Sequence, residues 1–156
     1  MREKIQESLE STSFRKIEEI YDTPFEWAFL VHSGSDKDFQ NSYKIPVYKT
    51  EESDNIIIRA SASFSEHHQS VISDMYENDN LTELQYEINS ITNGTDIIGS
   101  PEDEGGESCP LMYAKSYTFY QYFFPEDFSR TLLMNNITRA MNCVDHTWTL
   151  LWYFDD

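Results

Sequence analysis

Residues 111–124 read Leu111-Met-Tyr-Ala-Lys-Ser-Tyr-Thr-Phe-Tyr-Gln-Tyr-Phe-Phe124, and they are the most informative segment for the fold class. Half of its positions are aromatic, and aromatic side chains favour extended backbone. Because the aromatic residues fall on odd and even positions alike, both faces of the strand are largely apolar. We therefore predict the longest strand of the chain here, within a sheet that is covered at least in part on both faces.

The sequence after this strand predicts a long helix. Pro125-Glu-Asp127 ends the strand, and the helix begins near Asp127 or Ser129. Its apolar residues recur at intervals of three and four, which places them on one helical face: Leu133, Ile137, Ala140, Met141, Val144 and Trp148. The segment 148–154 is also rich in residues that favour strands, so it either extends the helix or forms another strand.

The N-terminal segment predicts a short helix followed by an ambiguous element. Residues 2–11 place Ile5 and Leu9 one helical turn apart among polar residues. Residues 14–21 fit either a helix or a first strand. Asp22-Thr-Pro24 ends that element, since proline interrupts both structures.

Three further strands are predicted before the middle of the chain. They lie at 26–32, 43–48 and 56–64, and turns are expected at 33–38 and 51–55. Pro46 has no amide hydrogen to donate to a neighbouring strand. The strand at 43–48 is therefore expected at an edge of the sheet.

The middle of the chain predicts two helices and a loop. Ser65 is a candidate N-cap, with His68 at the position where a capping box usually has Glu or Gln. Apolar residues at helical spacing follow: Val71, Ile72 and Met75, then Leu84, Ile88 and Ile91. The second helix should start at Asn80 or Thr82 and end near Asn93-Gly94. Residues 99–106, Gly-Ser-Pro-Glu-Asp-Glu-Gly-Gly, are expected to form an acidic loop.

This order of elements predicts the fold class. Strands and helices are segregated along the chain, with few strand–helix–strand crossovers. Such an order is typical of an α+β fold with a mostly antiparallel sheet, here flanked by an N-terminal helix, a middle helical segment and a C-terminal helix. A length of 156 residues fits one domain spanning 1–156.

The formal charge of −17 excludes several classes of partner. Nucleic acids and anionic membranes are bound by basic surfaces, so neither is an expected partner. Adaptation to a salty cytoplasm, a basic protein partner and mimicry of nucleic acid each explain such acidity. The acidic residues are spread along the whole chain, which favours a general, halophilic surface property.

The sequence also indicates a cytoplasmic location. The N-terminus, Met1-Arg-Glu-Lys-Ile5, is charged and lacks the apolar segment of a signal peptide. No window approaches the length of apolar residues that a membrane-spanning helix needs. We therefore expect a cytoplasmic protein.

Three stretches of the chain resemble a known group of proteins. They are Ile5 to Ile20, Ile56 to Met75 with Ser65-Glu-His-His-Gln69, and Tyr122-Phe-Phe-Pro-Glu-Asp127 followed by Ile137-Thr-Arg-Ala-Met-Asn142 and Trp148. The group consists of uncharacterised, mainly archaeal proteins whose fold is similar to that of type III secretion chaperones and YbjN. The resemblance implies a single chaperone-like domain that handles protein partners, often as a homodimer, and it supplies no catalytic residues.

No residue pattern in the chain predicts catalysis, a metal or a cofactor. His67 and His68 are adjacent and would point about 100° apart on a helix, so they are poorly placed to share an ion. Cys143 and His146 are three residues apart, but no glycine-rich turn offers an oxyanion hole. The acidic residues of 102–107 do not match a calcium-binding loop. We expect no enzyme activity and no cofactor.

The aromatic strand is the strongest candidate for an interaction surface. Tyrosine combines apolar area with a hydrogen-bonding hydroxyl, which suits it to interfaces. The candidate interface residues are Tyr113, Tyr117, Phe119, Tyr120 and Tyr122. We expect a homodimer formed through this strand at 113–124 or through the last helix at 129–148. We expect it to act as a noncatalytic protein-binding or chaperone-like module with an unidentified protein partner. The alternative is an acidic inhibitor or immunity-type protein that binds a basic protein.

Overall fold

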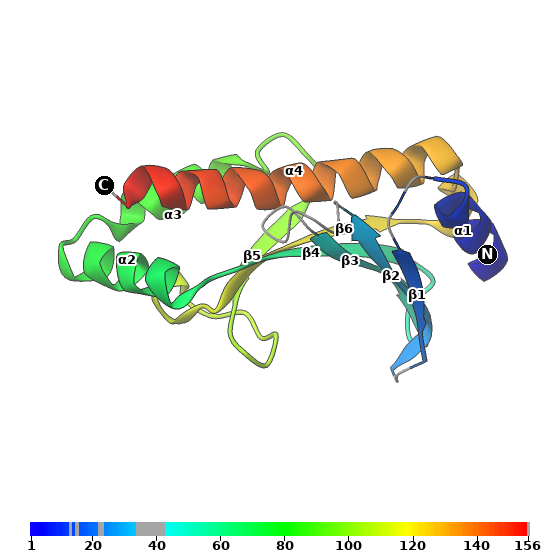
Figure 1. Ribbon diagram of the computed structural model, residues 1–156, viewed down its shortest axis with the longest axis horizontal. Helices are drawn as coiled ribbons and strands as arrows, with labels where there is room; N and C mark the ends of the chain where they lie inside the picture. The colour runs from blue at the N-terminus through cyan, green and yellow to red at the C-terminus, as the bar shows by residue number, and fades with distance from the viewer. Residues whose placement is uncertain (13, 15, 22–23, 34–42, 156) are drawn as a thin grey trace. The chain divides into compact units, whose positions relative to one another are not determined.

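The computed structural model describes residues 1–12, 14, 16–21, 24–33 and 43–155 (Figure 1). Its elements in chain order are α1 (Arg2–Glu10), β1 (Lys16–Ile20), β2 (Phe25–Ser33), β3 (Tyr43–Thr50), β4 (Ile56–Ser63), α2 (Glu66–Glu77), α3 (Leu81–Ser90), β5 (Ile98–Glu102), the 3-10 helix η2 (Leu111–Tyr113), β6 (Ser116–Phe123), the 3-10 helix η3 (Pro125–Asp127) and α4 (Arg130–Phe154). The strands form one six-stranded sheet in the order β1-β2-β3-β4-β6-β5. The α+β class, the mostly antiparallel sheet and the three helical regions are confirmed.

Contacts divide the chain into two compact units. Unit 1 comprises Met1–Ala60 and Gln121–Ala140, and unit 2 comprises Ser61–Tyr120 and Met141–Asp156. The single domain at 1–156 stays a prediction. Within the described ranges, no helix is both long enough and apolar enough to span a membrane.

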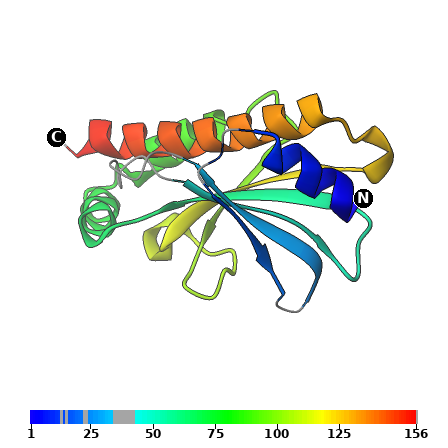
Figure 2. The same cartoon turned by 45° about the vertical axis from the view of Figure 1, so that its right-hand side comes forward.

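Unit 1 is built on the antiparallel strands β1, β2 and β3. Val31 of β2 lies opposite Ile17 on one side and Ile45 on the other, and both Val31 and Ile45 are buried. Within the ambiguous segment at 14–21, Lys16–Ile20 is therefore a strand, β1. Helix α1 contacts β2 and buries Ile5 and Leu9, as its helical spacing predicted (Figure 2).

The expectation that Pro46 marks an edge strand is wrong, since β3 lies between β2 and β4. Pro46 is opposite Leu30 of β2, whereas the register of β3 with β4 joins Val47 to Ile58 and Tyr48 to Ile57. That second pairing does not reach Pro46, so the missing amide hydrogen interrupts no ladder on the β4 side. The proline therefore lies where this inner strand is paired with β2 alone. The turn expected at 33–38 falls, beyond Ser33, outside the described residues, as do Asp22 and Thr23.

Unit 2 contains α2, α3 and β5, together with residues 116–120 of β6 and the C-terminal half of α4. Helix α2 begins as predicted: the Ser65 hydroxyl accepts a hydrogen bond from the amide of His68, and the His68 ring accepts one from the amide of Ser65. Imidazole thus completes a capping box in place of Glu or Gln. Helix α3 ends at Ser90, and Gly94, with φ +75°, follows in the turn.

The acidic loop predicted at 99–106 is wrong in its first half, which is the strand β5. Gly99 and Pro101 resemble turn residues in the sequence. In the sheet, β5 is an edge strand, which tolerates proline. Gly99 lies opposite Phe119, and a Cβ atom there would come within 2.8 Å of the Tyr117 ring. Glycine is therefore required by the close approach of two aromatic side chains.

The predicted strand at 111–124 is shorter than expected. Leu111–Tyr113 forms η2, and β6 covers Ser116–Phe123. With 8 residues β6 is shorter than β2, which has 9, so the prediction of the longest strand here is wrong. The amide of Lys115 donates to the carbonyl of Glu102, which is where β6 joins its pairing with β5. At the other end of the chain, α4 is helical through Phe154. The helical alternative for 148–154 is correct because Leu151 continues the buried face.

Candidate functional site

Charge is distributed unequally between the two units. Unit 2 contains 14 Asp and Glu residues and a single basic residue, Lys115, so its formal charge is −13. Unit 1 has the same number of acidic residues but ten Lys and Arg residues, which leaves −4. The acidity of the chain is therefore concentrated in one unit, which the sequence read as a linear string did not reveal.

Several acidic residues of unit 1 have basic partners. Arg2 pairs with Glu19, Lys16 with Glu18, and Lys49 with Glu26. The hydrogen bond from Arg2 holds the pKa of the Glu19 carboxyl below its usual value. In unit 2, Lys115 donates a 2.7 Å hydrogen bond to Gln69 Oε1 and is the one Lys or Arg available to 14 carboxylates.

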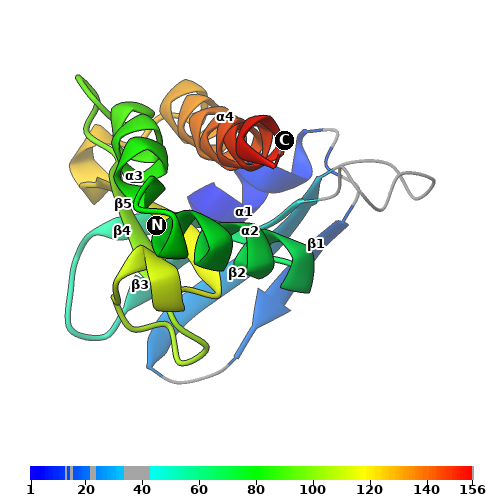
Figure 3. The ribbon, with the colours of Figure 1, turned by 90° about the vertical axis from the view of Figure 1, so that its left-hand side faces the viewer.

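A cleft in unit 2, which we call the α3 groove, lies between α3 and the last turns of α4. It is lined by Glu83, Glu87, Leu150, Tyr153 and Phe154 and has a volume of about 290 Å³. Figure 3 shows α3 beside the C-terminal end of α4. The groove therefore has carboxylates on one wall and mainly aromatic side chains on the other.

Helical periodicity places these side chains. Helix α3 buries Leu81, Leu84 and Ile88, so Glu83 is left exposed and Glu87 half-buried on another face. Near the end of α4, Leu151 is the buried residue, and Tyr153 remains 75% exposed. The rings of Tyr153 and Phe154 meet edge to face, with their centroids 5.2 Å apart.

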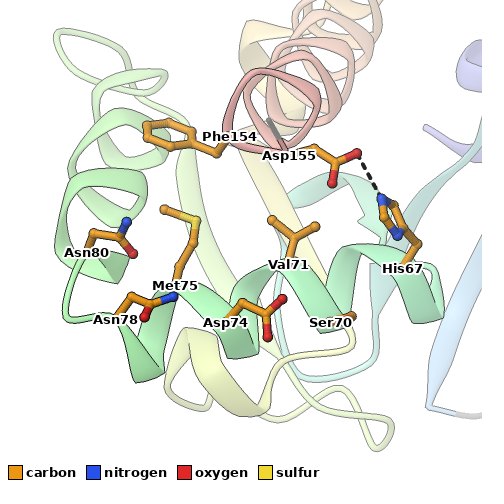
Figure 4. Close-up of a pocket in the computed structure, with 9 residues that line it drawn as sticks. All are labelled: His67, Ser70, Val71, Asp74, Met75, Asn78, Asn80, Phe154 and Asp155. Carbon is orange, nitrogen blue, oxygen red and sulfur yellow. Dashed lines mark hydrogen bonds and ion pairs between the residues drawn. The ribbon is translucent and has the colours of Figure 1, made fainter.

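A second cavity, the α2 hollow, lies in unit 2 along α2. It has a volume of about 230 Å³ and is lined by His67, Ser70, Val71, Asp74, Met75, Asn78, Asn80, Phe154 and Asp155 (Figure 4). His67 Nε2 lies 2.8 Å from Asp155 Oδ2. Phe154 lines both this hollow and the α3 groove.

The α2 hollow contains the residue types of a serine hydrolase without their arrangement. Ser70 lies one turn after His67, and Asp155 contacts the imidazole of His67. Activation of a serine needs a hydrogen bond from its hydroxyl to the base. Among the described residues, the Ser70 hydroxyl makes no such bond with His67. His68 is engaged in the N-cap, and burial, followed by the nearby charge of His67, lowers its pKa.

The five residues of the predicted interface do not form one surface. Tyr117 and Phe119 are buried, and the Tyr117 hydroxyl donates a 3.1 Å hydrogen bond to Asn89 Oδ1 of α3. Tyr120 is half-buried, and its hydroxyl donates to Glu102. Tyr122 is 43% exposed, and Tyr113, in η2, is 65% exposed. Two of the five are thus in the interior of unit 2, and whether the others meet a partner stays a prediction.

The other candidate side chains are dispersed. Cys143 is buried and His146 is exposed, and burial raises the pKa of the Cys143 thiol. Within residues 102–107, Glu102 is buried and accepts the Tyr120 hydroxyl, whereas Glu104 and Glu107 are exposed. Across the described ranges, no three His, Cys, Asp or Glu side chains are grouped to hold a metal ion.

The sequence profile of a family described as uncharacterized conserved protein (DUF2299) matches residues 1–151. This chain belongs to the DUF2299 family. The fold of this DUF2299 member is similar to the crystal structure of an uncharacterized protein from Methanothermobacter thermautotrophicus, with a TM-score of 0.76, 19% sequence identity and 98% of each chain covered. No curated protein matches the chain.

These comparisons confirm one part of the resemblance and leave another as a prediction. Membership of an uncharacterised conserved family and a fold shared with an archaeal protein are established. The chaperone-like assignment stays a prediction. The α3 groove was missed because its acidic wall and its aromatic wall are more than 60 residues apart in the chain.

Proposed function

We propose that this DUF2299 member is a noncatalytic module that binds another protein. The observation that carries the proposal is the set of large aromatic side chains exposed on α3 and at the end of α4 in unit 2. Tyr86 is 70% exposed, Trp152 is 73% exposed and Tyr153 is 75% exposed. Tyr153 lines the α3 groove beside Phe154, and exposed aromatic surface next to a groove favours an interaction site.

The identity of these side chains favours a protein partner. Tyrosine and tryptophan are enriched at interface centres because each buries a large rigid area and keeps a polar group for hydrogen bonding. Small-molecule sites are usually larger, enclosed and mostly apolar. The α3 groove, at about 290 Å³, is small and has carboxylates along one wall. These features fit recognition of side chains on another chain.

A chaperone-like role is the specific form that we favour. In this role the protein holds a partner and performs no chemistry on it. The buried Cys143 thiol, whose pKa is raised, and the missing bond between Ser70 and His67 support a role without catalysis. A homodimer in the cytoplasm is part of the same proposal.

The alternative is an acidic inhibitor or immunity-type protein that blocks a basic partner. The formal charge of −13 on unit 2 favours this alternative. The two functions differ in their response to salt. Screening weakens a complex that depends on exposed charges, whereas a complex that depends on buried aromatic area persists.

Affinity capture from the native cell, read by mass spectrometry, tests the proposal. The bait is the wild-type chain, compared with a Trp152→Ala/Tyr153→Ala variant and with Tyr21→Ala as a matched control. Tyr21 is a similarly exposed aromatic residue in unit 1. We expect a partner that the wild type and Tyr21→Ala both retain and that the double variant loses.

The proposed function is wrong if the double variant retains every partner of the wild type. Capture at low and at high salt separates the chaperone-like role from the acidic-inhibitor role. A partner that is lost only in high salt identifies the acidic inhibitor, and a partner that is kept identifies the chaperone-like module. Thermal melts of all three proteins ensure that loss of binding is not loss of folding.

A further inference from the structure

We propose that the α3 groove binds a Lys or Arg side chain from a basic segment of the partner protein. This inference rests on the proposed protein-binding function, in either its chaperone-like or its inhibitor form, and specifies the chemistry of the partner. Three properties of the groove carry it: two carboxylates without counter-charges, an exposed aromatic wall, and a volume suited to one side chain.

The carboxylates of Glu83 and Glu87 repel each other in the free protein. They are four residues apart on α3 and therefore adjacent on one helical face, where like charges destabilise a helix. Within the described part of the chain, neither carboxylate has a hydrogen-bond or ion-pair partner. A cation placed between them would remove this repulsion and form charge-assisted hydrogen bonds.

The opposite wall suits the rest of a cationic side chain. The rings of Tyr153 and Phe154, which meet edge to face, line this wall together with the aliphatic Leu150. A guanidinium or ammonium group is attracted to an aromatic face, and the methylene stem of Lys or Arg packs on apolar surface. The groove thus offers complementary surface to the charged and the apolar parts of the same side chain.

The residues around the groove favour a Lys or Arg side chain over a metal cation. Calcium takes six to eight oxygen ligands, and an aromatic wall provides none of them. A basic polypeptide segment, in contrast, also benefits from the formal charge of −13 on unit 2. Neighbouring basic residues of that segment would lie over a surface with one Lys and no Arg.

Fluorescence anisotropy with a defined probe tests the proposal. The probe is a fluorescein-labelled peptide of alternating arginine and glycine, and its control replaces each arginine with neutral citrulline. We expect the full-length protein at physiological ionic strength to prefer the arginine peptide. Glu83→Gln/Glu87→Gln should weaken binding about tenfold or more, because both charge-assisted contacts are lost.

Matched variants separate the groove from the general acidity of unit 2. Glu104→Gln/Glu107→Gln removes two exposed charges from the same unit and should weaken binding less than about twofold. Tyr153→Ala should weaken binding about threefold to tenfold, whereas Tyr113→Ala, which removes another exposed tyrosine of unit 2, should not. Circular dichroism melts check that every variant is folded.

Two results would overturn the assignment. One is an equal loss of affinity in the two double-glutamine variants, which identifies nonspecific attraction. The other is equal binding of the arginine and citrulline peptides. If the cellular partner is captured equally by wild type and Glu83→Gln/Glu87→Gln, the groove assignment fails and the protein-binding function stands. If the arginine peptide binds in the groove but capture retrieves no partner that depends on Trp152 and Tyr153, the function fails instead.

Discussion

His67 Nε2 lies 2.8 Å from Asp155 Oδ2, so the first turn of α2 is joined to the residue that follows α4. The two residues are 88 positions apart and both belong to unit 2. His67 is 66% exposed at its side chain, and Asp155 is 34% exposed. The contact lies at one end of the set of residues that line the α2 hollow (Figure 4).

We predict that this contact stabilises unit 2 only slightly. Asp155→Asn should lower the free energy of unfolding by less than about 1 kcal/mol, since exposed ion pairs are screened by water and salt. A double-mutant cycle with His67→Gln, measured by urea denaturation, isolates the interaction. A coupling energy several times larger would mean that the pair orders the end of α4.

The capping box of α2 should make stability depend on pH. Burial lowers the pKa of His68, so the folded state resists protonation below the ordinary value of about 6.5 while the unfolded state does not. The contribution of His68 is therefore complete above about pH 6.5 and is lost as the pH falls toward its lower folded pKa. Thermal melts between pH 7.5 and 5.5 measure this loss.

The matched variant for this effect is His68→Gln. Glutamine retains the hydrogen bond to the amide of Ser65 and does not titrate. We expect the variant to keep its stability at low pH relative to wild type, whereas Ser65→Ala should lose about 1 kcal/mol at every pH. If wild type and His68→Gln respond identically to pH, another group is responsible.

Local sequence signals predicted the elements that depend on neighbouring residues. Ser65 and His68, three positions apart, identified the start of α2, and Ile5 and Leu9 identified α1. Signals that depend on distant residues failed. Gly99 and Pro101 indicated a loop, but they lie in the strand β5. A strand can hold them here because β5 is at the edge of the sheet and because the Tyr117 ring leaves no room for a side chain at Gly99.

The candidate site shows the same division. The acidic wall of the α3 groove belongs to a predicted helix, whereas its aromatic wall belongs to 148–154, which the sequence left open between helix and strand. The groove exists only where α3 meets the end of α4. The aromatic strand was recognised from its composition. Because aromatic residues occupy both faces of this strand, the sequence did not show which face packs against a helix. The hydrogen bond from Tyr117 to Asn89 identifies the face that meets α3.

We predict that salt stabilises the protein. Unit 2 has 14 acidic residues and one Lys, so repulsion among its carboxylates opposes the compact state in dilute buffer. The melting temperature should rise between low salt and molar KCl, as screening shortens the range of repulsion. A melting temperature that does not change with KCl would contradict the interpretation of the charge as an adaptation to a salty cytoplasm.

Substitution by aspartate should have different effects on folding at Tyr117 and at Tyr120. Tyr117 is buried beneath α3, so Tyr117→Asp places an uncompensated charge in the interior and should unfold unit 2. Tyr117→Phe keeps the ring and should cost about 1 kcal/mol for the lost hydrogen bond to Asn89. Tyr120 is half-buried, and Tyr120→Asp should leave a folded chain. Circular dichroism distinguishes these outcomes, and equal unfolding of both aspartate variants would contradict them.

The last prediction is that the protein is a homodimer in which Tyr122 is buried. Tyr122 is 43% exposed near the end of β6, and Phe124, just beyond that strand, is 56% exposed. A twofold partner is the commonest cover for such aromatic surface, because one self-complementary patch suffices. Light scattering in high salt, where charge repulsion is screened, should give twice the chain mass of 18.4 kDa. Tyr122→Asp should give a folded monomer, while Tyr86→Asp, a matched exposed tyrosine on α3, should remain dimeric. A wild-type mass near that of one chain at tens of micromolar would rule out the dimer.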